Sequence, residues 1–172
     1  MVHPELDALD VAILRELQVD GRLSNLDLAR RIGLSPPATH TRVRRLERAG
    51  VIARYVAMLD TEAAGFDLVC YVQVGLRGHG RAEVDRFREV IREVPEVQEC
   101  HHVTGEYDYL LRVALRNRRE LERFVVERLS PLPGIARIQT SLVLREVKRS
   151  TELPLDPASG LVGADLDVAP AT

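Results

Sequence analysis

The spacing of apolar residues differs between the first part of the chain and the rest. In the first part apolar residues recur every three or four positions, which predicts helices over Leu6–Val19, Asn25–Ile32 and Pro36–Arg48. From Leu68 onward, stretches that alternate apolar and polar residues, typical of half-buried strands, are separated by further helical stretches. The pattern therefore predicts a helical domain followed by a mixed α+β domain.

The junction between the second and third predicted helices is typical of a helix-turn-helix. Gly33 is expected to end one helix, because glycine adopts positive φ without a steric cost. Ser35 stands where an N-cap belongs, and Pro36 occupies the first helical position, where its missing N–H is not needed. The third helix buries Val43 and Leu46 and leaves an arginine-edged face opposite. That face consists of Pro37, Thr41, Arg44, Arg45 and Arg48.

Positive charge is concentrated on this helix-turn-helix. The chain has 172 residues and a net charge of −2, yet Arg30–Arg54 contains seven arginines and a single acid, Glu47. A localised basic block on an acidic protein favours contact with phosphates. A charge run by itself is more often a solvated helix face. Its coincidence with a helix-turn-helix favours double-stranded DNA as the partner.

The residues around and after these helices predict how the chain is divided. Val51–Leu59 is rich in β-branched residues and predicts a strand, which suggests a winged helix-turn-helix. Asp60–Phe66 is polar and contains a glycine, as expected of a hinge. From Leu153 the periodicity is lost, which predicts disorder. The predicted boundaries are 1–60 for the helix-turn-helix domain with its trailing strand, 61–67 for the linker, 68–150 for the second domain and 151–172 for the tail.

The second domain contains an internal repeat. Strand, helix and strand follow one another twice, and each helix leads into its second strand through a proline corner, Pro95–Val97 and Pro133–Ile135. Two consecutive βαβ units give βαββαβ, the ferredoxin-like fold, with both helices on one face of an antiparallel four-stranded sheet. The predicted elements are Leu68–Leu76, Arg81–Val94, Gln98–Val103, Tyr107–Leu115, Arg118–Leu129 and Ala136–Leu144.

The sheet face without helices predicts a second copy of the chain as a partner. Its residues should be polar if they met water, but the strand Leu68–Leu76 has Val69 and Tyr71 on its second face. The last strand also has apolar residues on both faces, with Ile138 on one and Val143 on the other. An uncovered apolar face on a small domain predicts a homodimer. Two recognition helices in a dimer can address DNA half-sites one helical turn apart.

Several motifs, in a fixed order between Leu6 and Ser150, resemble those of one family. They are LDALDVAILRELQVDGRLSN, LARRIGLSP, RVRRLERAGVI, VQECHHVTGEYDYLL and, near the end, PGI followed by EVK. These motifs resemble the leucine-responsive regulatory protein (Lrp/AsnC) family. The resemblance implies a plain or winged helix-turn-helix, a ferredoxin-like effector-binding domain and control of transcription in prokaryotes. It also implies dimers that assemble into tetramers, octamers or larger species, and a small-molecule effector, usually an amino acid, with no cofactor.

Helical geometry and the resemblance together indicate the residues that meet DNA. The N-terminal end of the recognition helix is expected to reach base edges, and the flanking arginines are expected to meet phosphates. The residues predicted at the DNA surface are Ser35, Pro37, Ala38, Thr41, Arg42 and Arg45, with Arg30, Arg31, Arg44 and Arg48 on phosphates.

The effector site of the family resembles the turn between the two βαβ units. Gly105 lets the backbone approach a ligand, free N–H groups can hold a carboxylate, and Asp108 can accept an ammonium group. Taken without the resemblance, the same residues fit a simple hairpin corner. The residues predicted for the effector are Thr104, Gly105, Glu106, Tyr107, Asp108 and Tyr109, with Thr140 and Ser141 from the last strand.

Two other functions compete with this interpretation. A metal sensor would use Cys100, His101 and His102 with His79 or Cys70, but successive strand residues face opposite sides, and CxxC or HxxxH spacing is absent. Some relatives with the same two-domain build decarboxylate tetrapyrrole side chains. Because histidine is the usual proton-transfer residue, His79, His101 and His102 are compatible with such an enzyme. The full arginine edge of the recognition helix argues for a regulator instead. The sequence has no membrane span or signal peptide, which predicts a cytoplasmic protein.

Overall fold

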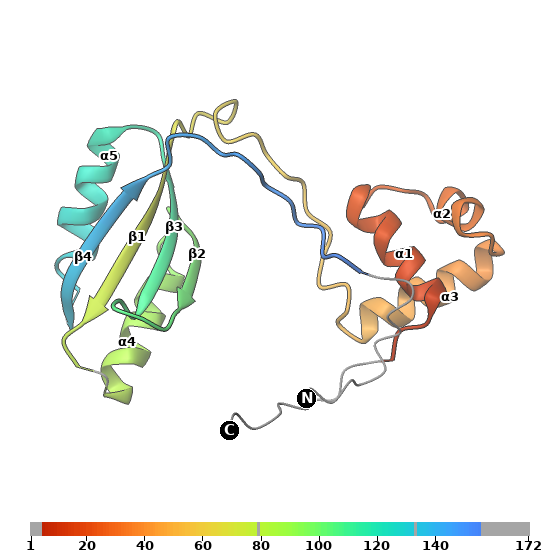
Figure 1. Cartoon of the computed structure of the whole chain (residues 1–172), viewed down its shortest axis with the longest axis horizontal. Coiled ribbons are helices and arrows are strands. Elements are labelled where there is room, and N and C mark those ends of the chain that lie inside the picture. Colours follow the sequence, from red (N-terminus) through yellow and green to blue (C-terminus); the bar gives the residue numbers. More distant parts are fainter. Residues whose placement is uncertain (1–4, 79, 133, 156–172) are drawn as a thin grey trace, which may run out of the picture. The chain divides into compact units, whose positions relative to one another are not determined.

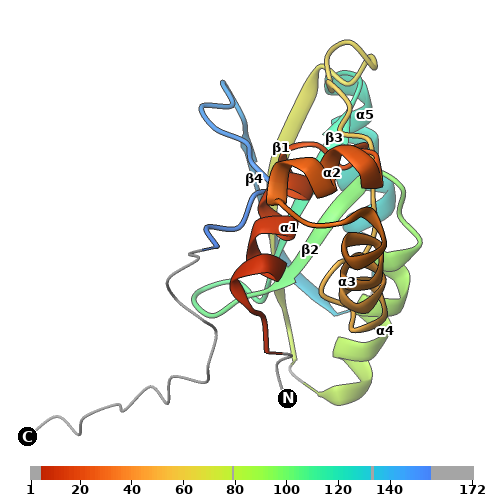
Figure 2. The ribbon, with the colours of Figure 1, turned by 90° about the vertical axis from the view of Figure 1, so that its right-hand side faces the viewer.

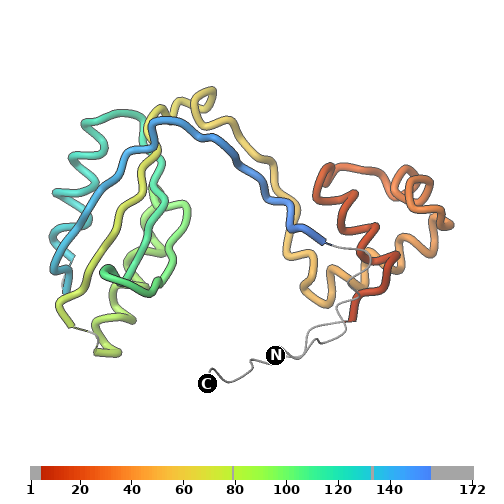
Figure 3. The backbone as a smooth tube through the Cα atoms, viewed as in Figure 1, coloured from red at the N-terminus to blue at the C-terminus, as the bar shows by residue number. Residues whose placement is uncertain are grey.

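The computed structural model describes residues 5–78, 80–132 and 134–155, which form two compact units (Figure 1). One unit contains the residues up to Ala57 together with the segment that starts at Arg149, and the other is Met58–Lys148. The chain therefore passes between the units twice, as the tube in Figure 3 traces. Of the predicted tail, residues 156–172 lie outside the described residues.

The first unit is a bundle of three short helices. Its core consists of four buried side chains: Ile13, Leu14, Leu28 and Leu46. Leu155, from the segment that returns from the second unit, packs against this core. The helices are α1 (Ala8–Val19), α2 (Asn25–Ile32) and α3 (Pro36–Arg48), and no helix in the described residues is long and apolar enough to cross a membrane.

The strand expected over Val51–Leu59 is not found in the structure. Val51 and Ile52 instead finish α3, since both backbone N–H groups donate to the carbonyl of Leu46, at 3.0 and 3.3 Å. Their side chains pack against the helical core. Residues 53–60 belong to no strand. A β-branched composition favours a strand only where a second strand supplies hydrogen-bonding partners, so the composition was misleading here.

The second unit confirms the ferredoxin-like prediction. Its four strands form an antiparallel sheet in the order β2-β3-β1-β4, and α4 and α5 lie on the same side of it (Figures 1 and 2). The elements are β1 (Leu68–Leu76), α4 (Arg81–Arg92), β2 (Val97–His102), β3 (Tyr109–Leu115), α5 (Arg118–Arg123), the π-helix η1 (Phe124–Leu129) and β4 (Ile135–Leu142).

The last predicted helix changes geometry half-way along its length. Within η1 the carbonyl of Val125 accepts hydrogen bonds from both the backbone N–H and the hydroxyl of Ser130, at 2.9 and 2.8 Å. Five residues separate this donor and acceptor, which is the π-helical pattern. Phe124 and Leu129 are still buried against the sheet, as the apolar spacing predicted.

The register of the strands fixes which residues face the helices. Cys70, Val72 and Val74 of β1 are fully buried under them. Ile138 lies opposite Val74 in β4, so it also belongs to the covered side. The uncovered face combines apolar and polar residues: Val69, Tyr71, Gln73, Leu110, Arg112, Gln139 and Ser141.

Candidate functional site

The turn between α2 and α3 is held by local hydrogen bonds. Gly33 adopts φ of +71°, and the next backbone N–H, that of Leu34, donates to the Ala29 carbonyl at 3.0 Å. The Ser35 hydroxyl accepts a long hydrogen bond from the Ala38 N–H, at 3.4 Å. The Asn25 side chain donates to the Pro36 carbonyl at 2.8 Å and so ties the start of α2 to the start of α3. The angle between the two helices is therefore fixed at the turn.

One side of α3 is available to a partner. Thr39 and Leu46 are buried on the opposite side, against the rest of the bundle. On the available side the Thr41 hydroxyl donates to the Pro37 carbonyl at 3.0 Å, so its oxygen can still accept a hydrogen bond. The exposed residues of the helix are Pro36, Pro37, Ala38, His40, Thr41, Arg44, Arg45 and Arg48.

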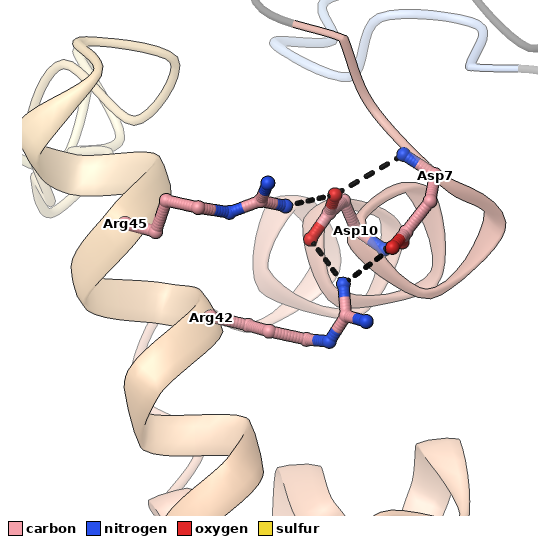
Figure 4. Close-up of polar contacts among 4 residues, drawn as sticks. All are labelled: Asp7, Asp10, Arg42 and Arg45. Atoms are coloured by element: carbon pink, nitrogen blue, oxygen red, sulfur yellow. Dashed lines mark hydrogen bonds and ion pairs between the residues drawn. The ribbon is translucent and has the colours of Figure 1, made fainter.

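Two arginines of α3 are bound to carboxylates at the start of α1 (Figure 4). Asp7 and Asp10 cap α1 reciprocally, and the Asp10 carboxylate is fully buried. Arg42 Nη1 donates to Asp7 Oδ2 at 2.6 Å and to Asp10 Oδ1 at 3.0 Å. Arg45 Nη2 donates to Asp10 Oδ2. The side chain of Arg42 is 26% exposed and that of Arg45 is 52% exposed, so Arg45 alone keeps a large surface toward solvent.

This network shifts the pKa values of two of its members. Burial pushes the pKa of Asp7 upward, but the hydrogen bonds and charge of Arg42 and the backbone N–H of Asp10 outweigh it, so the pKa is lowered. The hydrogen bond to Asp7 raises the pKa of Arg42, which keeps the guanidinium charged. The contacts therefore favour the ionised form of both partners.

The other arginines form exposed pairs within the same unit. Arg31 reaches Glu16 of α1 at 2.8 Å, and Arg44 reaches Glu47 at 3.3 Å. Arg30 lies 3.4 Å from Asp27, and Arg48 Nε donates to the Arg44 carbonyl at 3.1 Å. Exposed ion pairs contribute at most about 1 kcal/mol, so a phosphate can replace the carboxylate in the three pairs with Glu16, Glu47 and Asp27.

The turn that contains Gly105 lies against β4. Gly105 has φ of +125°, which residues with a Cβ rarely adopt. The exposed carboxylate of Glu106 pairs with Arg137 at 2.7 Å, and the Tyr107 hydroxyl donates to Gln139 Oε1 at 2.7 Å. The Arg137 guanidinium also lies over the Tyr107 ring, 4.5 Å from its centroid. The turn is thus an ordered structure with side chains of both charges at its surface.

The last two residues of this predicted site hold the turn to the sheet. Asp108 Oδ2 accepts the Leu76 N–H at 2.7 Å, and the Asp108 N–H donates to the Val74 carbonyl at 3.0 Å. Tyr109 is buried, its ring stacks on His102, and its hydroxyl accepts a hydrogen bond from Arg88 at 3.1 Å. Both residues therefore have a positioning role, whatever else the turn binds.

Comparisons with known proteins match both units. Residues 6–53 match the family described as winged helix-turn-helix DNA-binding, and residues 69–153 match the Lrp/AsnC ligand binding domain. A leucine-responsive regulatory protein of Rhizobium meliloti is 41% identical over 90% of this chain and 99% of its own length. The chain belongs to the Lrp/AsnC family. It is a DNA-binding transcriptional regulator of that type.

Further relatives and solved structures agree. The leucine-responsive regulatory protein of Escherichia coli K12 is 39% identical over 87% of this chain and 91% of its own length. A transcriptional regulator of Neisseria meningitidis, solved as a complex with L-Met, has a TM-score of 0.85 and 36% identity over 89% of this chain and 99% of its own. An AsnC family regulator from Agrobacterium tumefaciens has a TM-score of 0.82 and 34% identity over 87% of this chain and 97% of its own.

The structure groups the predicted effector residues of this Lrp/AsnC regulator differently from the prediction. Residues 104–109 form one turn, but its contacts with β4 described above are to Arg137 and Gln139, which the sequence reasoning missed. Thr140 lies opposite Val72 on the helix-covered side, whereas Ser141 lies opposite Tyr71 on the uncovered face. Adjacent strand residues face opposite sides, so these two side chains point to different faces of the sheet. Alternation counted from Arg137 would have indicated Gln139 and Ser141 as its neighbours.

The histidines and cysteines considered for a metal or for an enzyme are dispersed. His102 is exposed and stacks on Tyr109, while His101 lies on the other side of β2 with its ring nitrogen 3.2 Å from Glu99. Cys70 is buried and Cys100 is exposed. His79 lies outside the described residues. Within the described part of the chain, no three His, Cys, Asp or Glu side chains are placed to hold one metal ion.

Proposed function

We propose that the exposed side of α3 reads an operator sequence, and that an amino acid or similar small molecule bound at the turn 104–109 modulates this binding. The observation that carries the DNA part is the combination of a rigid turn with an exposed helix face of small, polar and arginine residues. Because Ser35, Pro37, Ala38 and Thr41 have short side chains, the helix backbone can approach the bases closely in the major groove.

The roles on α2 and α3 divide by position. Pro37, Ala38 and Thr41 lie at the N-terminal end of α3, where the methyl and hydroxyl groups can contact base edges. Arg30, Arg31, Arg44 and Arg48 lie at the rim, where exposed guanidinium groups meet phosphates. Ser35 acts mainly as the N-cap of the helix, with its backbone N–H toward the DNA. The proposal thus gives individual residues of this chain a role in the DNA binding that characterises the family.

The effector is proposed to bind as a zwitterion at the turn. The backbone N–H groups around Gly105 would hold its carboxylate, and the carboxylates of Glu106 and Asp108 would attract its ammonium group. A relative of known structure was solved with L-Met, which supports an amino acid as the class of ligand. Tyr107 and Arg137 supply an aromatic and a cationic surface beside the turn.

The active species is proposed to be a homodimer joined through the uncovered sheet face. Val69, Tyr71 and Leu110 give this face an apolar centre, and Tyr71 is 39% exposed in the single chain. Sheet faces of this kind become buried when two copies pack together. Since the DNA partner lies in the prokaryotic cytoplasm, the protein is proposed to act there.

Fluorescence anisotropy on DNA from upstream of the protein's own gene tests the proposal. The full-length protein is titrated into this duplex and into a scrambled duplex at two salt concentrations. We expect tighter binding to the natural duplex at both, and affinity that falls steeply with salt. Thr41→Ala should relax the preference at one base position, while Arg48→Ala should weaken binding to both duplexes equally. Equal affinity of the wild type for the two duplexes would refute operator reading.

The effector part needs a second measurement on the same protein. Each of the twenty amino acids is added at millimolar concentration to the complex with the natural duplex, and the change in Kd is recorded. We expect one or a few to change the Kd at least threefold in the wild type, and Glu106→Gln to reduce that change. Glu89→Gln, on an exposed position of α4, makes the same change of charge and is the matched control; it should respond like the wild type. A wild type that no amino acid affects would refute the amino-acid effector but leave operator reading intact.

A further inference from the structure

The Asp10 carboxylate is the only acidic side chain among the described residues that is fully buried, and it lies between α1 and α3 (Figure 4). Its Oδ1 accepts Arg42 Nη1 at 3.0 Å, and its Oδ2 accepts the Asp7 N–H at 3.1 Å and Arg45 Nη2. A buried charge is tolerated only when it is paired and hydrogen-bonded. Asp10 meets that condition because α3 supplies two arginines and Asp7 a backbone N–H.

The two arginines differ in what they leave exposed. Arg42 is held between Asp7 and Asp10 and is about three-quarters buried, so it acts as a strut between α1 and α3. Arg45 has one nitrogen on Asp10, while half of its side chain is exposed beside Thr41 and Arg48 on the DNA-facing side. A guanidinium group has five N–H donors in a rigid plane. Arg45 uses Nη2 on Asp10, so the donors on its other nitrogens are available to a further acceptor.

We propose that Asp10 is a positioning residue for DNA recognition: it fixes the guanidinium group of Arg45 on α3 so that its free edge meets one pair of acceptors on the operator. This inference rests on the proposed reading of DNA by α3. The Asp10 charge has two effects on Arg45. It restricts the rotamers of a long side chain, which lowers the entropy lost on specific contact. It also offsets positive charge, which weakens attraction to any phosphate.

These two effects predict opposite changes when the charge is removed. Asp10→Asn keeps the size of the side chain and releases Arg45 from its ion pair, while Arg42 keeps its contact with Asp7. Affinity for the natural duplex should fall, because Arg45 is no longer held in place. Affinity for a scrambled duplex should rise, because Arg45 is no longer neutralised by Asp10 and is available to phosphates. A purely structural role would give a different result, since a loosened bundle weakens binding to both duplexes.

Glu47 supplies a matched control on the same helix. Its carboxylate pairs with exposed Arg44 and accepts the Tyr55 hydroxyl, and neither contact reaches α1. Glu47→Gln changes the net charge by the same amount as Asp10→Asn. If added charge alone raises non-specific affinity, both variants show that rise. Only Asp10→Asn should lose affinity for the natural duplex.

The experiment is a set of anisotropy titrations of the full-length proteins on the natural and scrambled duplexes over a salt series, with far-UV circular dichroism to verify folding. We expect the ratio of the two Kd values to fall at least tenfold in Asp10→Asn and less than twofold in Glu47→Gln. On the scrambled duplex, the slope of log Kd against log salt should steepen by about one in Asp10→Asn, since one more arginine can contact a phosphate.

Arg45→Gln keeps the inference testable if Asp10→Asn fails to fold, because it leaves the Arg42 strut in place. In Arg45→Gln the ratio of the Kd values for the two duplexes should fall as far as it does in Asp10→Asn. In the double variant the ratio should fall no further. A wild-type ratio in Arg45→Gln would overturn the inference, as would equal loss on both duplexes in a folded Asp10→Asn protein. A wild type with no preference between the duplexes would refute the proposed function instead.

Discussion

Leu46 connects the recognition helix to the core of the first unit, and shortening it to alanine should release α3. The side chain is 1% exposed and packs with Ile13, Leu14 and Leu28. A buried Leu→Ala change typically costs about 2–5 kcal/mol. A bundle of this size is stable by only about 3–8 kcal/mol, at about 0.05–0.15 kcal/mol per residue. The change therefore removes a large part of the stability of the helical unit, while the sheet unit has a separate core.

Hydrogen exchange followed by mass spectrometry separates the two units. In Leu46→Ala the amides of α1, α2 and α3 should exchange about 30-fold to 4,000-fold faster, the equivalent of the same 2–5 kcal/mol, while those of β1 and β3 keep their wild-type rates. Leu46→Met conserves volume, so it should cost less than about 1.5 kcal/mol and serve as the control. Wild-type exchange across α1–α3 in Leu46→Ala would show that packing of Leu46 does not hold the recognition helix.

Three further outcomes test other contacts of the helical unit. Ser35→Ala removes the N-cap of α3 and should cost about 0.5–1 kcal/mol in urea unfolding, whereas Ser35→Gly should cost only a few tenths. The folded-state pKa of Asp7 lies below its ordinary value, so its stabilisation is present above that value and lost as the pH falls through the folded pKa. Asp7→Asn should therefore lose less stability than the wild type between about pH 6 and pH 3, and an equal loss would contradict the role of Arg42. Leu155→Ala should lower the melting temperature of the helical unit, because Leu155 packs on its core. Leu153→Ala should not, since the exposed Leu153 binds Gln18 through its backbone alone.

The first and last residues of an element could be predicted where they depend on neighbouring residues in the sequence. The bounds of α2 and α3 follow from Gly33, Ser35 and Pro36, each of which acts within one helical turn of its own position. The strand β1 has the predicted bounds because apolar residues occupy every second position from Leu68 to Leu76 and form the face that packs against the helices. The segment Val51–Leu59 has the composition of a strand but no partner, and only the folded chain shows which strands have partners.

The candidate sites depend on pairs that are distant in the sequence, which is why a helical wheel cannot assign their arginines. A wheel gives the direction of a Cβ atom, but a guanidinium group several bonds farther out goes to the carboxylate that it can reach. Arg42 and Arg45, three residues apart on α3, are neighbours on its surface, and both reach Asp10, 32 and 35 residues earlier in the chain. A signal was present in the sequence, since Asp7 and Asp10 have the spacing of a capping box and precede an arginine-rich helix. It follows that α1, which has no predicted contact with DNA, decides how much of Arg42 and Arg45 is left exposed on α3.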